Sequence, residues 1–229
     1  MSIATEAPDL HTLEPDPLEA KPQEVERYVA AVQEIAEHDP ELAQRLAWNQ
    51  IRLAGVRSRR RPTEAQESLN RIFRLGAPPD PSIDGPTRGI LVTPVLPSFA
   101  QVPFRGLAEA WMPWAGKRFD AQSATGDNLL QTSARTPMRA LWRSYRPDES
   151  GDGRLVAFKF RTYASPGTLD QDRQTMKIDY DSDENPDRVI RNILDELMQV
   201  VPGAYLGKVL LRRRRSVPWR LVGYFALQN

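Results

Sequence analysis

Charged side chains recur at every second residue along two stretches with the alternating pattern of β-strands, residues 154–163 and 173–181. Alternate residues of a strand lie on one face, so the charged residues of each stretch share a face. If these strands are neighbours, that face carries Lys159, Arg161, Tyr163, Lys177, Asp179 and, from a third strand, Lys208. Facing inward, such a cluster would bind an anionic or carbonyl-bearing ligand, or exchange protons with it. Facing outward, it would be an ordinary polar surface.

Aromatic residues near these strands could line the same cavity, or they could simply fill a core. They are Trp111, Trp114, Phe119 and Tyr205. The candidate ligand-binding residues are therefore Trp111, Trp114, Lys117, Phe119, Arg161, Tyr163, Lys177, Asp179, Tyr205 and Lys208. No residue is assigned a catalytic role from its position in the sequence.

Several kinds of site are excluded or disfavoured by composition. The chain has no cysteine, which excludes disulfides, thiolate nucleophiles and cysteine-ligated metals or clusters. The two histidines, His11 and His38, are far apart in the sequence, which disfavours a histidine triad or a multi-histidine metal site. The acidic run 179–185 lacks the mid-loop glycine of a calcium loop, and we interpret it as a turn. We expect neither a cofactor nor a metal.

Two arginine-rich runs, 57–61 and 212–215, are the sharpest concentrations of charge. They could bind phosphates or a phospholipid headgroup, but no aromatic residues alternate with them. The formal net charge is only +1, from 31 basic and 30 acidic residues, which argues against a nucleic-acid partner. We interpret both runs as solvated turns. Because no stretch approaches the roughly 18–20 apolar residues of a membrane-spanning helix, we expect a cytoplasmic, soluble protein.

The elements that position these residues fall into two parts. Residues 1–22 hold four prolines without periodicity and are predicted to be a mobile arm. Residues 23–76 are predicted to be helical, with helices beginning near Pro22, Pro40 and Pro62. A linker at 77–83, rich in proline, separates this segment from the remainder of the chain.

Residues 84–229 contain several short strand patterns, which predict an antiparallel barrel. The strands are expected near 87–95, 114–120, 127–132, 154–163, 173–181, 204–213 and 217–228, with short helical stretches near 104–111 and 138–145. Within 185–201, apolar residues also fit one face of a helix that ends at Pro202-Gly203. The predicted fold class is α+β, mainly antiparallel β: a lipocalin-like barrel preceded by a helical segment, with a helix at about 186–201 packed against it.

The segment Gly85-Pro86-Thr87-Arg88-Gly89, followed by Gly116-Lys117-Arg118-Phe119-Asp120 and a closing strand that ends Tyr224-Phe225-Ala226-Leu227, carries a family resemblance. Residues 84–229 resemble the lipocalin-like bacterial proteins of the GXWXG type, whose function is unassigned, with Thr87 at the tryptophan position. The resemblance implies a small barrel with room for a ligand.

These observations leave three functions open. The leading hypothesis is binding of a hydrophobic or amphiphilic small molecule, lipid-like or polyketide-like, inside the barrel. The alternative is a cofactor-independent cyclase or isomerase that uses Lys177, Asp179 and a tyrosine in acid–base roles. The third is a protein-interaction module that works through the helices. The sequence specifies neither the ligand nor the oligomeric state.

Overall fold

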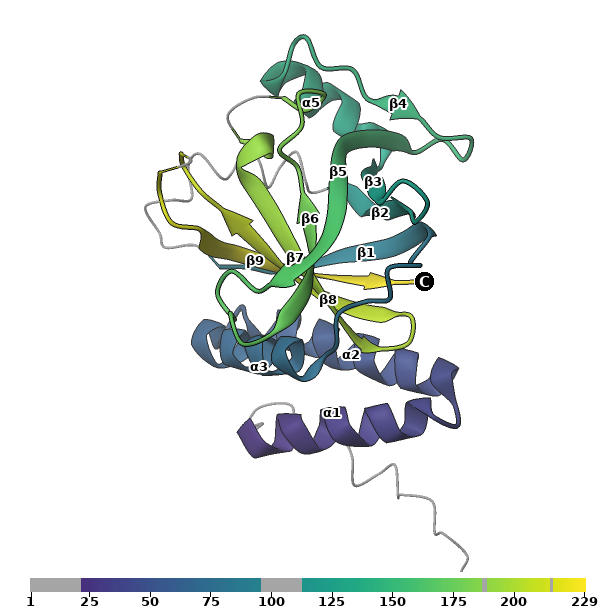
Figure 1. Cartoon of the computed structure of the whole chain (residues 1–229), viewed down its shortest axis with the longest axis vertical. Coiled ribbons are helices and arrows are strands. Elements are labelled where there is room, and N and C mark those ends of the chain that lie inside the picture. Colours follow the sequence, from purple (N-terminus) through teal and green to yellow (C-terminus); the bar gives the residue numbers. More distant parts are fainter. Residues whose placement is uncertain (1–21, 96–112, 187–188, 215) are drawn as a thin grey trace, which may run out of the picture.

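The computed structural model describes residues 22–95, 113–186, 189–214 and 216–229. Three helices lie against one side of a closed antiparallel β-barrel (Figure 1). This arrangement confirms the predicted α+β class and the helical segment that precedes the barrel. Residues 1–21 of the predicted arm, the predicted helical stretch at 104–111 and the candidate Trp111 lie outside the described residues.

Each of the three helices begins at a proline, as predicted: α1 is Pro22–Ala36, α2 is Pro40–Arg57 and α3 is Pro62–Leu75. Proline suits the first turn because its missing N–H has no helical partner there in any case. The Asp39 carboxylate caps α2 by accepting a hydrogen bond from the Leu42 N–H at 2.9 Å. Within the described ranges, no helix is both long and apolar enough to cross a membrane.

Eight strands form the barrel: β1 (Gly85–Pro94), β2 (Trp114–Asp120), β3 (Thr125–Leu130), β5 (Leu155–Pro166), β6 (Gln174–Asp179), β7 (Ile193–Val201), β8 (Ala204–Leu211) and β9 (Arg220–Gln228). They are ordered β3-β2-β1-β9-β8-β7-β6-β5, and the pairing of β3 with β5 closes the sheet. The short β4 (Asp148–Glu149) pairs with the start of β5. Short helical segments connect some of the strands: η3 (Thr132–Ala134), α5 (Arg135–Leu141) and η4 (Ile190–Asn192).

The predicted helix at 186–201 is wrong, because η4 is followed there by strand β7. On the predicted helix, Asp195 and Glu196 would lie opposite the apolar face, whereas in β7 both are buried. Residues of β7 alternate between the barrel interior and the helices, so both of its faces are apolar and the pattern mimics a helix. Pro202-Gly203 does not end a helix; it forms the turn of the β7–β8 hairpin, where Gly203 has φ of +75°.

Two hydrophobic cores result from this alternation. The inner core lies inside the barrel and includes Phe119, Phe160, Ile178, Leu197 and Phe225. The outer core joins the helices to the barrel wall and includes Val29, Ile51, Phe73, Met198, Leu206 and Tyr224. The helices and the barrel therefore share a core.

The predicted linker at 77–83 begins with a strand-like contact. Ala77 and Gln199 exchange backbone hydrogen bonds at 2.9 and 2.7 Å. The chain is thus tied to β7 immediately after α3. The linker in the sequence predicts that residues 84–229 fold without the helices, whereas this contact and the shared outer core lead us to expect that the barrel depends on them.

An irregularity in β5 changes the face of one predicted position. Phe158 has a left-handed φ of 56°, and the β3–β5 register shifts between Gly126 and Asn128. Simple alternation would place Ala157 on the same face as Lys159 and Arg161, but it is buried in the inner core together with Phe158. The strand alternation predicted for 154–163 therefore holds only beyond the bulge.

Candidate functional site

Four polar side chains converge inside the barrel from separate parts of its wall. Lys117 lies on β2, Asn128 on β3, Tyr180 directly after β6 and Asp195 on β7. Each is at most 2% exposed. We call these four residues the interior polar cluster. Their neighbours are the apolar side chains of the inner core, where an unpaired polar group is costly.

Lys117 is the centre of the hydrogen bonds in this cluster. Its Nζ donates to Asp195 Oδ2 at 2.9 Å, to Asn128 Oδ1 at 3.1 Å and to the Tyr180 hydroxyl. The Tyr180 hydroxyl donates in turn to Asp195 Oδ2 at 3.0 Å, and Asn128 Nδ2 donates to the Tyr180 oxygen at 3.1 Å. An ammonium, a phenol and a carboxylate are therefore within direct proton-transfer distance of one another.

Aromatic rings surround the ammonium group. Lys117 Nζ lies 5.0–5.6 Å from the centroids of three rings, those of Trp114, Phe160 and Phe225, and it contacts Tyr180 through the hydroxyl. A cation within about 6 Å of a ring centroid is attracted by the electron-rich face. This attraction offsets part of the cost of burying the ammonium.

Glycines in the barrel wall give these rings room to lie against the sheet. A Cβ on Gly126 would be 2.5 Å from the Phe160 ring, and one on Gly207 would be 2.1 Å from the Phe225 ring. Both contacts are shorter than any tolerated van der Waals distance. The positions of the two glycines therefore determine where the rings, and so the apolar surroundings of Lys117, can be.

Burial shifts the pKa values in this cluster in opposite directions. Desolvation lowers the pKa of Lys117, against the opposing effect of the Asp195 charge. It raises the pKa of Asp195, against the effect of Lys117, and it raises the pKa of Tyr180 well above its ordinary value. The gap in proton affinity between the lysine and the aspartate is therefore narrower than in water, which favours exchange of a proton between them.

One oxygen of the cluster is not satisfied. Asp195 Oδ1 is buried and has no hydrogen-bond partner among the described residues, while Oδ2 takes both bonds. An unsatisfied buried acceptor costs about 1–3 kcal/mol, and more when it is charged. A donor group from a bound molecule would remove this cost.

Trp114 connects the cluster to the surface. Its Nε1 donates to Asn128 Oδ1 at 3.0 Å, and its ring lies where a Cβ on Gly89 would be, at 2.5 Å. The same half-buried tryptophan also lines an open hollow of about 580 Å³ beside Arg154 and Gln228.

A second group of buried charges lies on the outer face of the barrel, beneath α3 and the β5–β6 connection. Lys177 pairs there with Glu196, and Lys208 pairs with Asp170. The Lys208 Nζ also donates to Asn70 Oδ1 of α3 at 2.6 Å. These pairs join the strands to the elements packed on them.

The predicted candidates are therefore divided between the two faces of the barrel wall. Trp114, Lys117, Phe119 and Tyr205 belong to the interior. Asp179 forms an ion pair with Arg161 at 3.0 Å on the outside, where Tyr163 is exposed. Lys177 and Lys208 also lie on the outer face, although they are covered. The inward-facing interpretation of this register is wrong, because the apolar partners Met176 and Ile178 occupy the interior.

The sequence interpretation missed Asn128, Tyr180 and Asp195. Alternation in the stretch 173–181 places Tyr180 on the same face as Met176 and Ile178, and this placement is the signal that marks its hydroxyl as an interior polar group. Asp195 was hidden by the helical interpretation of β7. Read as a strand, the same sequence places Asp195 between Ile193 and Leu197 on the inner face.

Comparison with known proteins does not identify a function. No protein-family model matches the sequence, and no curated protein matches it. The chain is similar to a solved structure described as a protein from Thermomonospora curvata, with 17% sequence identity, coverage of 72% of this chain and 85% of that chain, and a TM-score of 0.41. Function is therefore inferred from the geometry of the interior polar cluster.

Proposed function

We propose that the protein binds a small amphiphilic molecule inside the barrel, with a hydrogen-bond donor of the ligand on Asp195. The observation that carries this proposal is the buried Asp195 Oδ1, which has no partner among the described residues although Lys117 and Tyr180 hold the other oxygen. A hydroxyl or N–H group of a ligand fits this acceptor. The apolar part of the ligand would lie against the rings around Lys117.

The main chain of Lys117 is also held in place, which supports a binding role. The Thr87 hydroxyl donates to the Lys117 carbonyl at 2.9 Å and accepts from its N–H at 3.3 Å. Thr87 occupies the tryptophan position of the GXWXG pattern, so membership of that lipocalin-like group remains part of the proposal. A fixed backbone reduces the ordering cost of binding, because the polar group is already positioned.

Native mass spectrometry of protein purified from its own host would identify the ligand. An environment-sensitive apolar dye would then measure binding in competition with that ligand. We expect Asp195→Asn to weaken binding of a donor-bearing amphiphile about tenfold or more, from the loss of a charge-assisted hydrogen bond. Asp179→Asn is the matched control, because Asp179 is a strand carboxylate on the outer face. Equal affinities for the two variants, or no saturable dye binding, would refute the proposal.

A second function is favoured by the Tyr180 hydroxyl, which bonds both to Lys117 and to Asp195. This arrangement could transfer a proton to or from a bound carbonyl compound, as a cofactor-independent isomerase or cyclase does. Tyr180→Phe would then preserve ligand affinity while the turnover of the identified ligand falls about 100-fold or more. If the ligand is recovered unchanged after incubation with the wild type, the protein is a binder.

A further inference from the structure

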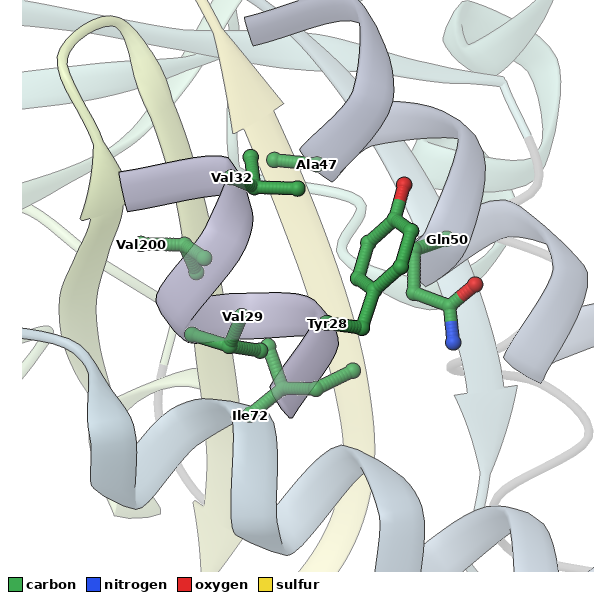
Figure 2. Close-up of a pocket in the computed structure, with 7 residues that line it drawn as sticks. All are labelled: Tyr28, Val29, Val32, Ala47, Gln50, Ile72 and Val200. Carbon is green, nitrogen blue, oxygen red and sulfur yellow. The ribbon is translucent and has the colours of Figure 1, made fainter. Parts of the chain in front are cut away.

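Helix α1 packs over part of the groove between α2 and α3. Figure 2 shows Val29 and Val32 of α1 directed toward Ile72 of α3 and Ala47 of α2, and the space left among these side chains is about 10 Å³. The covered part of the groove is thus closely packed. Tyr28 closes its edge by donating to the Leu46 carbonyl at 3.0 Å.

The direction of α1 along this groove follows from its contacts with α3. Gln33 donates to the Leu75 carbonyl at 3.2 Å, and about two turns earlier in α1 Glu26 pairs with Arg71 at 3.1 Å. Helices α1 and α3 therefore run in the same direction, so the start of α1 lies toward the start of α3. The first turn of α1 therefore lies toward the end of the groove formed by the last turns of α2 and the first turns of α3.

That end of the groove is open and has an apolar floor. A hollow of about 570 Å³ lies there, and its lining includes Leu53, Val56, Ala65 and Ser68. Leu53 lies two turns after Leu46 on the same side of α2. Leu46 is packed beneath α1, whereas Leu53 is 44% exposed and Val56 is 65% exposed. Large apolar side chains continue along the groove beyond the point where α1 begins.

The rim of this hollow is strongly basic. The described residues that line it include four arginines and one acid, Glu64, which pairs with Arg61; the arginines are Arg57, Arg59, Arg60 and Arg61. The chain that leads into α1, residues 1–21, has the complementary composition: five acids, Glu6, Asp9, Glu14, Asp16 and Glu19, with leucines at 10, 13 and 18 and one lysine. An apolar groove with an arginine rim is suited to an acidic segment that also carries leucines.

We infer that the open part of the α2–α3 groove is the docking site of the chain's own segment 1–21. The segment is tethered at the mouth of the groove, so its effective concentration there is high and modest contacts suffice. Its carboxylates would pair with the arginine rim, and its leucines would cover Leu53 and Val56. An anionic partner of the arginine rim would then have to displace this segment.

The absence of cysteine permits a direct test in the full chain. Thr12→Cys is combined with Ser68→Cys in the groove, and the rate of intramolecular disulfide formation under mild oxidation is followed by mass spectrometry. The matched control joins Thr12→Cys to Ser216→Cys, which lies beside the other arginine-rich run. We expect the groove pair to close about tenfold faster than the control pair, because docking raises the local concentration of the two thiols.

Charge reversal tests what holds the segment. Arg59→Glu with Arg60→Glu should slow closure of the groove pair about tenfold, and added salt should slow it in the same direction. Arg213→Glu with Arg214→Glu, the same change at the other arginine run, should leave the rate unchanged. Equal rates for the two cysteine pairs, indifference to the reversal at 59 and 60, or disulfides formed mainly between two molecules would each overturn the inference.

Discussion

Loss of either partner of the buried ion pair between Lys117 and Asp195 should destabilise the protein. Lys117 is 1% exposed and Asp195 is 0% exposed, so Lys117→Met leaves a carboxylate inside the barrel with only the Tyr180 hydroxyl as a donor. Removing one member of a buried ion pair typically costs about 3–5 kcal/mol. Because a domain is stable by only about 5–15 kcal/mol, the variant should unfold at a much lower urea concentration.

The double variant Lys117→Met with Asp195→Leu separates the charge effect from packing. Replacing both partners with apolar residues removes the uncompensated charge, so the double variant should be more stable than the Lys117→Met single variant. Urea titrations followed by tryptophan fluorescence measure all the free energies. The ion pair of Arg161 with Asp179 on the outside of the barrel is the control. Arg161→Met should change the free energy of unfolding by no more than about 0.5 kcal/mol, since the guanidinium is largely exposed. If the free-energy changes of Lys117→Met and Asp195→Leu, measured separately, add up to the change in the double variant, the two residues do not interact and the pairing is refuted.

The same single variant has a defined pH dependence. Burial raises the pKa of Asp195, and Lys117 opposes this rise, so removing the lysine raises the pKa further. With its pKa raised, the folded state binds a proton more readily than the unfolded state. The penalty therefore disappears as the pH falls from above the folded pKa toward the ordinary carboxyl value. Lys117→Met should approach wild-type stability on acidification, and a penalty independent of pH would contradict an ionised Asp195.

Three further predictions concern the aromatic rings around Lys117, the buried charges on the outer face of the barrel and the three helices packed on it. Gly207→Ala places a methyl group 2.1 Å from the Phe225 ring and should destabilise the protein by about 1–3 kcal/mol in urea unfolding, whereas Gly151→Ala meets open space and should be neutral. Burial raises the pKa of Asp170, but hydrogen bonds from Lys208 and Arg74 outweigh this effect, so the pKa is lowered. The free energy of unfolding should therefore fall as the pH drops below the ordinary carboxyl value. Asp170→Asn should flatten this acidic part of the curve of stability against pH. The fragment 84–229 should fail to unfold cooperatively in a thermal scan, because it exposes the barrel half of the outer core; a sharp transition would show that the barrel folds alone.

The helical segment could be predicted from the sequence because its signals are local. Proline at the start of α1, α2 and α3, together with the period of the apolar residues, fixes each helix without reference to the remainder of the chain. Strand β7 was misread because its environment is not local. The interior and the helices bury opposite faces of it, so the alternation that would identify a half-exposed strand is absent.

The interior polar cluster was inaccessible to sequence reasoning for a related reason. Its members are separated by 11 to 78 positions along the chain, and only the closure of the sheet brings them together. The sequence correctly grouped Lys177 with Asp179 on one strand face, but nothing local states whether that face points inward. Lys117 and Trp114 were selected as candidates, whereas the groups that bond to them came from strands whose register was unknown.

Strand β7 carries two consecutive carboxylates that are buried on opposite faces, and the comparison between them favours the inner one as the functional group. Each has one oxygen without a partner among the described residues, Asp195 Oδ1 and Glu196 Oε2. Glu196 has a structural task, because it accepts from the Thr168 N–H at 2.6 Å and from Lys177, and so ties the β5–β6 connection to the barrel. Asp195 joins only residues that already belong to the barrel wall. An apolar side chain would close the interior as well and at lower cost, so the buried charge of Asp195 supports the proposal of a ligand that bonds to it.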